Sequence, residues 1–597
     1  PGVRGRFLDE VKVHYPGIEL ICDARLSLAS DPYLADYRVD GLPVLASAMA
    51  IEALAQGASA LAGRPLRQAT AVTVEAPVVV PPAGGEPTRV RVCALAEGDK
   101  IITVLRCEES GFAVDHVRAE FRLDAAPDDD LMPAAGLEGN STGLVDGAEL
   151  YGPVCFQSGR FRRIAMLPEV TSRSCRALAR GADERPWFVT PGQLTLERLA
   201  PGPLTPDRLP PREALTRAAT AAGPVTPAAI SDELLLGSPG LNDVVLQVLQ
   251  ACVPHRRVWL AGCASAWFSG RLADGPAEVR AVARPPATPD RAGSAVGVPA
   301  PARSPDRAAA PLPSSVPVPS GLTWDVQVVD ADEQVLASWR GVRLREAGLL
   351  PRNAAWPPSL LSVYLERSAA GLGLDPGLRV AVRCGEPAQA ADHAPAGTIP
   401  RPRDAEDPEA PGGGGPWMNG RRIVDVPLPD EPLPVPEQAG NPDGLAVAEG
   451  TGPLAGFTLE ASGVRSAACG WAAADPQHAV WPADQGLLAS LAAAFSRLRN
   501  HLSESPACSG ARLRAVAACL AMAHAPERAP VARERATGDG WALLEIAGAR
   551  VACTVVEVSG VSRPVAIAIL TDPPRRIRRP ARPAAEHRED HLAARPT

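Results

Sequence analysis

One helix-forming run near the N-terminus constrains the fold most, because it is apolar on almost every side. In Gly41–Ala62 the apolar residues are not confined to one stripe, and a helix of this kind is buried over most of its surface. Four strand-like runs follow it, at Ala71–Val80, Val90–Ala96, Ile101–Cys107 and Val114–Leu123. A buried helix with antiparallel strands that wrap it predicts an α+β fold for a first block, residues 1–127.

Two further blocks follow along the chain. The second, residues 149–350, has a predicted helix at Gly240–Cys252 and predicted strands at Leu322–Val329 and Val335–Leu344. Residues 354–373 also have a helical pattern. The third block, residues 443–571, has predicted helices at Ala483–Leu502 and Ala511–His524, and predicted strands at Trp541–Ile546, Arg550–Val556 and Val565–Leu570.

Proline-rich stretches separate and interrupt these blocks. Proline accounts for 64 of the 597 residues, which is roughly twice its ordinary frequency. We expect a flexible insertion at residues 276–319, a disordered linker at 384–442 and a charged, solvated tail at 572–597. The apolar fraction of 46% excludes a fully disordered chain.

Composition excludes several classes of function. The net charge of −8 gives no basic face for a nucleic acid. The 12 cysteines include no C-x-x-C pair, so neither a zinc site nor a disulfide framework is predicted, and a reducing cytoplasm fits best. We expect no membrane partner, because no run reaches the length of a membrane helix. The chain starts at Pro1, which is consistent with a piece of a larger polypeptide.

A short string before the first helix resembles a catalytic motif. It reads Asp31-Pro-Tyr-Leu-Ala-Asp-Tyr37-Arg-Val-Asp-Gly41 and continues to Ala46. The first motif of polyketide synthase dehydratase domains has a histidine, a glycine four residues later and a proline nine residues later. The same offsets give Tyr37, Gly41 and Ala46, so only the glycine is retained.

A second motif lies on the predicted helix of the second block. Asp243-Val-Val-Leu-Gln247 matches the family's Asp with Gln or His four residues later. Other strings that resemble the second half of these domains are Tyr151-Gly-Pro153, Phe156-x-x-Gly159-Arg-Phe161 and Leu322–Leu344. The resemblance covers residues 1–350 and is closest in character to iterative enediyne-type synthases. It implies a double hotdog, in which a long helix is wrapped by antiparallel sheet, twice.

The replaced histidine determines which chemistry the resemblance allows. In the family, histidine removes the α-proton of a β-hydroxyacyl thioester and aspartic acid protonates the departing hydroxyl. The resemblance assigns these catalytic positions to Tyr37 and Asp243, with Gln247 one helical turn away. A tyrosine with a pKa of about 10 is ionised in only about one molecule in a thousand at pH 7. We therefore expect Tyr37 and Asp243 to face one another across a shared acyl tunnel, with dehydratase activity lost or severely weakened.

Structural interpretations of the same residues stay open. Tyr37 is alternatively a packing residue with a polar tip, and Asp243 a carboxylate that the start of a helix stabilises. His116 replaces the missing base only if its strand lines the pocket of Tyr37.

The third block resembles another enzyme family. Strings within Val464–Trp471, Ala511–Leu520 and Asp539–Leu544 resemble the phosphopantetheinyl transferase (holo-acyl-carrier-protein synthase) domain at the C-terminus of enediyne-type synthases. That family implies coenzyme A and Mg²⁺ held by carboxylates as cofactors. Here Gly470-Trp471-Ala472 replaces Asp-Trp-Glu, and Ala518 replaces a glutamate, so no metal ligand is assigned. Since substitutions at a surface cost little stability, the fold can outlive the activity.

The sequence thus predicts the C-terminal part of an enediyne-type polyketide synthase in antibiotic biosynthesis, with an acyl carrier protein and its polyketide thioester as partners. Whether it is an enzyme stays open. The first two blocks either dehydrate with Asp243 as the acid and an unrecognised base, or form a scaffold that docks a carrier protein or, by analogy, forms a homodimer. Alternatively, residues 443–571 transfer phosphopantetheine with displaced acids.

Overall fold

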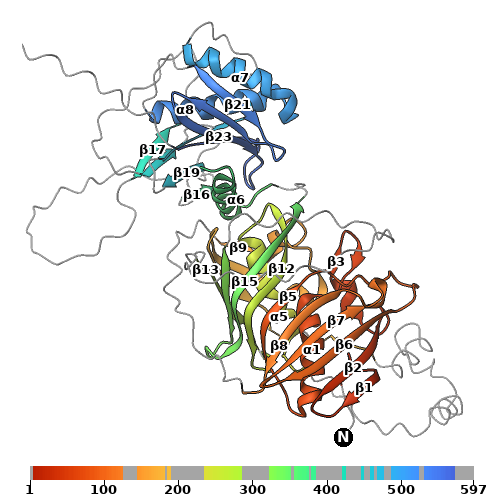
Figure 1. Ribbon diagram of the computed structural model, residues 1–597. Helices are drawn as coiled ribbons and strands as arrows, with labels where there is room; N and C mark the ends of the chain where they lie inside the picture. The colour runs from red at the N-terminus through yellow and green to blue at the C-terminus, as the bar shows by residue number, and fades with distance from the viewer. Residues whose placement is uncertain are drawn as a thin grey trace, which may run out of the picture. The chain divides into compact units, whose positions relative to one another are not determined.

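The structure is a computed structural model, shown in Figure 1, and its described residues form two compact units. Described are residues 5–124, 144–181, 185–189, 234–273, 275–284, 322–350, 355–374, 378–384, 420–424, 445–449, 457–462, 467–475, 486–523 and 530–571. The first unit contains the described residues up to 384, together with 457–458 and 556–562. The second unit contains the remaining described residues.

The first half of the first unit is a helix held against six strands. The helix α1 (Ser47–Ala62) is rich in alanine and leucine and is buried along nearly its whole length. It ends at Gly63, whose φ of 70° is the left-handed conformation that glycine adopts readily. The strands lie in the spatial order β1 (Glu10–Tyr15), β2 (Glu19–Leu26), β6 (Thr88–Glu97), β7 (Lys100–Cys107), β8 (Asp115–Arg122) and β5 (Gln68–Val74).

Glu52 and Gln56 are two of the polar side chains that α1 buries, and both have partners. The carboxylate of Glu52 accepts hydrogen bonds from the backbone N–H groups of Leu235 (2.8 Å) and Leu236 (2.9 Å). Gln56 Oε1 accepts one from the backbone N–H of Phe7 (3.1 Å). Because each buried acceptor is satisfied, α1 can lie in the core and also fix the two segments that donate to it.

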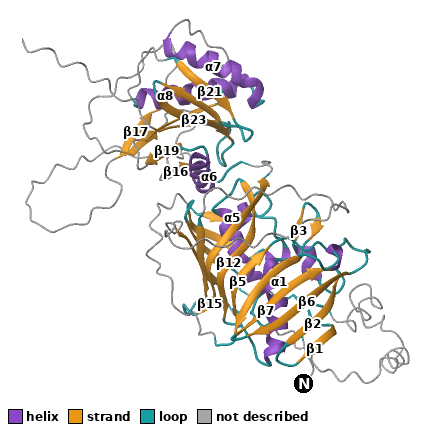
Figure 2. Cartoon of the chain, in the orientation of Figure 1, coloured by secondary structure: helices purple, strands orange, loops and turns teal. Residues whose placement is uncertain are grey.

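The second half repeats the arrangement around the helix α5 (Pro239–Ala251), which is buried at every position. Its strands continue the sheet in the order β12 (Arg256–Phe268), β15 (Val335–Leu349), β14 (Thr323–Val329), β13 (Ala277–Arg284), β11 (Ser174–Ala179), β10 (Ile164–Val170) and β9 (Val145–Asp146). Antiparallel pairing of β5 with β12 joins the halves into one sheet of 13 strands. Figure 2 shows α1 and α5 covered by this sheet, and the two helices contact each other.

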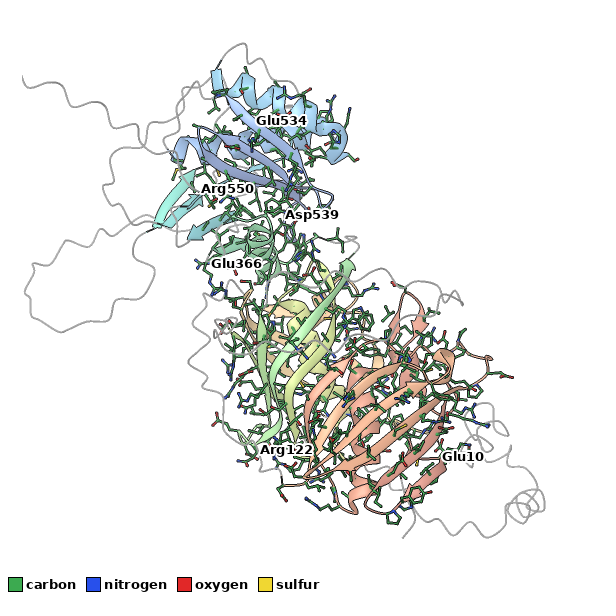
Figure 3. The ribbon with its side chains drawn as sticks, in the orientation of Figure 1. Glu10, Arg122, Glu366, Glu534, Asp539 and Arg550 are labelled. Carbon is green, nitrogen blue, oxygen red and sulfur yellow. The ribbon has the colours of Figure 1, made fainter. Side chains whose placement is uncertain are left out.

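The first unit extends beyond residue 350. The helix α6 (Pro358–Gly371) carries Arg367, which donates to the backbone oxygen of Cys252 (3.1 Å). Glu366, labelled in Figure 3, accepts from the backbone N–H groups of Ser172 (3.3 Å) and Val380 (3.0 Å). The strand β16 (Arg379–Cys384) follows. These buried contacts join α6, which lies beyond the boundary predicted at 350, to the first unit.

The second unit is a mixed helix and sheet domain with its own core. Its five-stranded sheet has the order β20 (Ala467–Ala473), β24 (Val565–Thr571), β23 (Ala549–Val556), β22 (Ala542–Ile546) and β21 (Val531–Ala536). The helix α8 (Pro506–Met522) packs on β20 and β24, and α7 (Gly486–Leu502) packs on α8 and β21. Further strands are β17 (Gly420–Val424), paired in parallel with β18 (Leu445–Glu449), and β19 (Phe457–Ser462).

Several predicted bounds differ from the structure. The helix predicted from Gly41 begins at Ser47, because β4 (Leu42–Pro43) pairs with β3 (Arg38–Val39). The strand predicted over 71–80 ends at Val74. The strands β1, β2 and β12 were not predicted individually.

Two stretches predicted to be irregular contain strands. The predicted insertion at 276–319 begins with β13, whose Val279 and Ala281 are buried between β11 and β14. The predicted linker at 384–442 contains β17. The remainder of the insertion, nearly all of the remainder of the linker, and the tail at 572–597 lie outside the described residues.

Candidate functional site

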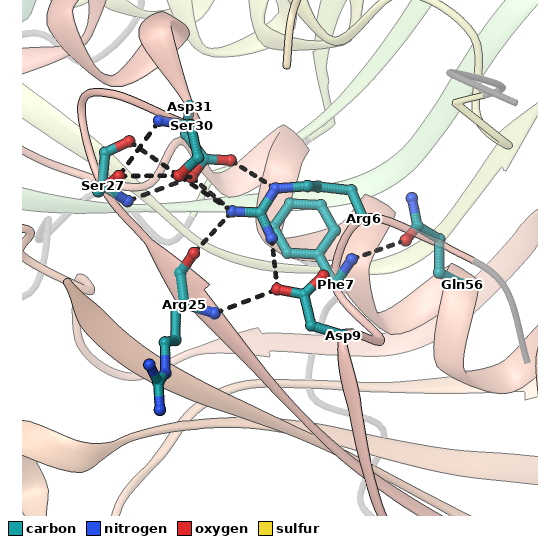
Figure 4. A network of polar contacts seen from close by, with 8 residues as sticks. All are labelled: Arg6, Phe7, Asp9, Arg25, Ser27, Ser30, Asp31 and Gln56. Carbon is teal, nitrogen blue, oxygen red and sulfur yellow. Dashed lines mark hydrogen bonds and ion pairs between the residues drawn. The ribbon is translucent and has the colours of Figure 1, made fainter. Parts of the chain in front are cut away.

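The segment that leads to Tyr37 is fixed by a buried ion pair. Asp31 is fully buried, and both of its carboxylate oxygens accept from the Arg6 guanidinium, at 2.9 Å (Nε) and 2.6 Å (Nη2). Ser30 Oγ (2.7 Å) and the backbone N–H of Ser27 (3.2 Å) donate to the same carboxylate (Figure 4). A two-pronged contact of this kind fixes direction as well as distance. The chain therefore leaves Asp31 in a defined orientation.

A second polar contact ties the same segment to the other half of the sheet. The short 3₁₀ turn Pro32–Asp36 ends at Asp36, whose carboxylate accepts from the backbone N–H (3.1 Å) and the guanidinium of Arg160. Its backbone oxygen accepts from the N–H of Ser158 (2.9 Å). These bonds hold Tyr37, the next residue, against the second half.

Tyr37 is packed against two aromatic rings, and its hydroxyl contacts Asp243. The side chain is 1% exposed, and its ring meets the rings of Phe156 and Phe161 edge to face, each at 4.9 Å between centroids. The hydroxyl donates a hydrogen bond of 3.1 Å to Asp243 Oδ1. The structure therefore brings together the two residues that the sequence pattern singled out.

Asp243 is buried on α5 and accepts three hydrogen bonds. Its second oxygen, Oδ2, accepts from Gln247 Nε2 (2.9 Å) and Gln157 Nε2 (3.2 Å). Burial raises the pKa of Asp243 to about 6, although the hydrogen bonds from Gln247, Tyr37 and Gln157 favour the ionised carboxylate and limit the rise. At pH 7 roughly one carboxyl in ten is protonated.

Gln247 orients Asp243. Its Nε2 also donates to the backbone oxygen of Phe161 (2.9 Å), and its Oε1 accepts from the hydroxyl of Tyr151 (2.7 Å). The Tyr151 oxygen in turn accepts from the backbone N–H of Ile164 (2.8 Å). With its amide held on both sides, Gln247 can present only N–H to the carboxylate.

The hydroxyl of Tyr37 can donate a proton in a hydrogen bond but cannot act as a base near neutral pH. Burial, and then the neighbouring Asp243 carboxylate, raise the pKa of Tyr37 well above 10. His116 does not line the pocket that reaches Asp243, and its Nδ1 lies at 3.3 and 3.2 Å from the backbone oxygens of Ala76 and Pro77. Burial lowers the pKa of His116, and no described contact joins it to Tyr37 or Asp243.

Gln157 is a site residue that the sequence interpretation missed. It follows Phe156 directly in a string that was noted only for its resemblance. The contact with Asp243 depends on the turn that brings residues 156–161 under α5, and spacing along the chain does not reveal it.

A small pocket reaches Asp243, and Tyr37 is not part of its walls. The walls come from the start of α1, from α5, and from β12 and β15; they are Ser47, Ala48, Asn242, Asp243, Val245, Leu246, Leu249, Leu260, Trp339, Val342 and Leu344. Tyr37 and Asp243 face one another through a direct hydrogen bond, and the predicted acyl tunnel between them stays a prediction.

In the second unit, the positions that the resemblance assigns to metal-binding acids lie inside the core. A Cβ added at Gly470 would lie 2.5 Å from the backbone oxygen of Ala515, since α8 approaches β20 closely there. Ala472 and Ala518 are buried as well. The expectation that these positions are at the surface is wrong. They lie in the core, and the close packing there leaves no room for an acidic side chain at Gly470.

Other acids of this unit are engaged elsewhere. Glu504 accepts from Arg512 (2.7 Å), and Asp475 from Arg563 (3.0 Å). Within the described parts of the chain, no three His, Cys, Asp or Glu side chains are placed to hold a metal ion. Asp484, His478 and His524 lie outside the described residues.

None of the described helices is long and apolar enough to cross a bilayer.

Comparison with known proteins gives one family and a set of solved structures. Residues 10–105 match the family of polyketide synthase dehydratase domains. No curated protein matches the chain. Similar structures include the dehydratase domain from the CurJ module of curacin polyketide synthase, at 15% identity and a TM-score of 0.38, over 57% of this chain and 98% of that one. The dehydratase domain of a mycocerosic acid synthase-like polyketide synthase has 14% identity and a TM-score of 0.34, over 58% and 98%.

Proposed function

We propose that the first unit acts in polyketide biosynthesis as a dehydratase-like double hotdog that binds β-hydroxyacyl thioesters of an acyl carrier protein without removing water from them. The match of residues 10–105 to polyketide synthase dehydratase domains supports the substrate class. The hydrogen bond from Tyr37 to Asp243 carries the argument that the chemistry is lost.

Elimination of water needs a base and an acid together. The α-proton passes to the base, the double bond forms between Cα and Cβ, and the hydroxyl leaves with a proton from the acid. With a pKa of about 6, Asp243 keeps a protonated fraction at neutral pH and can supply that proton. Tyr37 cannot accept the α-proton, and its hydroxyl donates instead to Asp243 Oδ1. The site retains an acid without a base.

Binding without turnover makes the unit a scaffold. It would hold a carrier protein and its acyl chain for another active site, and a homodimer of the unit would bring two such carriers together. The pocket beside Asp243 is the place where an acyl group would enter.

The proposal includes the second unit. We assign residues 443–571 to a relative of the phosphopantetheinyl transferases of enediyne-type synthases, on the strength of the strings around Gly470, Ala511 and Asp539. Magnesium does not fit, because the described residues around Gly470 and Ala518 offer no carboxylate and no room for one. Labelled coenzyme A, apo carrier protein and Mg²⁺ should give no labelled carrier with the full chain; labelling would contradict the argument that magnesium does not fit this unit.

The test of the main proposal restores the base. A β-hydroxybutyryl carrier protein is incubated with the full chain, with Tyr37→His and with Tyr37→Phe, and loss of one water is followed by mass spectrometry. We expect dehydration only with Tyr37→His. Turnover by the unmodified chain would overturn the proposal. A folded Tyr37→His variant that binds the thioester and leaves it intact would show that the acyl group does not reach Asp243.

A further inference from the structure

Two buried cysteines are in contact at the end of α5. Cys252 directly follows α5, and Cys175 lies on β11, a strand on which α5 packs. Neither side chain is exposed to solvent. The Cys252 thiol donates to the backbone oxygen of Ser174, the residue before Cys175, at 3.7 Å. A hydrogen bond joins the two thiols, and both cysteines are free in this structure.

The elements that carry the two thiols hold them in this relative position. The strand β11 is paired on both sides, with β10 and with β13. The helix α5 is buried at every position. A disulfide has strict requirements for the distance and direction between two cysteines, and thiols that already touch need little movement to meet them. The fold therefore presents each sulfur atom to the other at a high effective concentration.

The helix α6 covers this pair. Arg367 donates to the backbone oxygens of Cys252 (3.1 Å) and Ser172, and its guanidinium lies 5.5 Å from the centre of the Trp324 ring. The contact with Cys252, and then burial, raise the pKa of Cys175 well above its ordinary value. Cys175 is therefore a thiol at neutral pH, and thiol–disulfide exchange needs a thiolate. We expect oxidation of this pair to be slow and to require a local opening of α6.

We propose that Cys175 and Cys252 form a redox pair whose oxidation to a disulfide ties the end of α5 to β11. The thiolate of one cysteine attacks a small disulfide, such as oxidised glutathione, and releases one small thiol. The second cysteine then displaces the other small thiol from the mixed disulfide, so two electrons and two protons pass from the cysteines to the two released thiols. This inference does not depend on the proposed function.

The test equilibrates the folded full chain with mixtures of reduced and oxidised glutathione at about pH 8.5, near the pKa of an ordinary thiol. Free thiols are then alkylated, and linked peptides are identified by mass spectrometry. We expect a peptide that joins Cys175 to Cys252, which increases with the oxidised fraction and disappears with dithiothreitol. Arg367→Met loosens the cover, so the same link should form about tenfold faster, the effect of one lost hydrogen bond.

A second measurement reports on the tether itself. Because the bond closes a long loop, the thermal midpoint of the first unit should rise by about 5 °C on oxidation. Cys175→Ala should abolish both the link and the rise. The matched control Cys263→Ala removes a buried cysteine of β12 and should keep both.

Three results would overturn the inference. One is the absence of the linked peptide from both the unmodified chain and Arg367→Met. Another is glutathione attached to Cys175 or Cys252 without a link between them, because the two sulfur atoms would then not reach each other. The third is linkage of other cysteines as often as this pair, because the fold would then not select it.

Discussion

Tyr37 and Gly470 both stand where a resemblance to an enzyme family assigns a reactive side chain, but the structure accommodates them differently. The side chain of Tyr37 reaches further than that of a histidine, and its hydroxyl enters the hydrogen-bond network of Asp243. Gly470 is the smallest residue, and α8 packs directly onto it. Tyr37 leaves a polar site around Asp243 in place, whereas Gly470 lies in packed core. Under the proposed function, we therefore expect a single substitution to restore chemistry in the first unit but only to damage packing in the second.

The largest effect is expected at Gly470. Gly470→Asp introduces the acid that the resemblance assigns to this position, but its Cβ would collide with the backbone oxygen of Ala515. We expect a loss of stability of about 3 kcal/mol or more, or failure of the second unit to fold. The control Gly538→Asp has open space at its Cβ and should leave the denaturation midpoint unchanged. Equal midpoints for the two variants would show that α8 does not lie tightly on β20.

Asp243→Asn tests the buried charge of the first unit. The folded-state pKa of about 6 lies above the ordinary value of 3.8, so folding costs free energy once the carboxylate ionises. The contribution of this group to the stability of the unmodified chain is highest below about pH 4 and falls as pH rises to about 6, by about 3 kcal/mol. The amide of the Asp243→Asn variant does not titrate, so urea denaturation should show the advantage of that variant growing over this window. An advantage that does not vary with pH would contradict the raised pKa.

Tyr37→Phe removes one hydrogen bond and keeps the ring between Phe156 and Phe161. Because the lost O–H favoured the ionised form, we expect a further rise in the pKa of Asp243 and a loss of about 2 kcal/mol at pH 8. Tyr15→Phe is the matched control, since Tyr15 is 60% exposed. A Tyr37→Phe protein as stable as the control would indicate that the hydroxyl contributes nothing to the site.

The smallest effect concerns Gly41, the residue that the first motif retains. Its φ of 82° is left-handed, and no atom lies within 4 Å of its Cβ position. Gly41→Ala should therefore cost only conformational strain, about 1 kcal/mol. Gly371→Ala, at an open position with an ordinary φ, should be neutral or slightly stabilising. A loss at Gly41 far above that size would point to a contact that the structure does not show.

Periodicity in the sequence was enough to predict the main elements. The all-round apolar run predicted α1, and strand-like runs predicted β6, β7 and β8, because these features are local. The strand β13 was hidden by the prolines that follow it, and β1 escaped because its side chains are mostly exposed and carry little pattern. Local sequence also could not reveal that Gly470 faces α8, since this depends on how two distant elements pack.

The site was only partly predictable for the same reason. The pairing of Tyr37 with Asp243 came from a resemblance between motifs, and spacing alone would not have joined residues 206 positions apart. The role of Gln157 depends on which side chains meet around α5. Its burial and its hydrogen bond to Asp243 are properties of the folded chain.

A carbon-13 NMR titration of the Asp243 carboxyl tests the central claim most directly. In the unmodified chain, the Asp243 resonance, identified by its absence in Asp243→Asn, should titrate near pH 6, and in Tyr37→Phe at a higher pH. Titration at the same pH in both proteins would contradict the account, because the phenol would then not be bonded to the carboxylate.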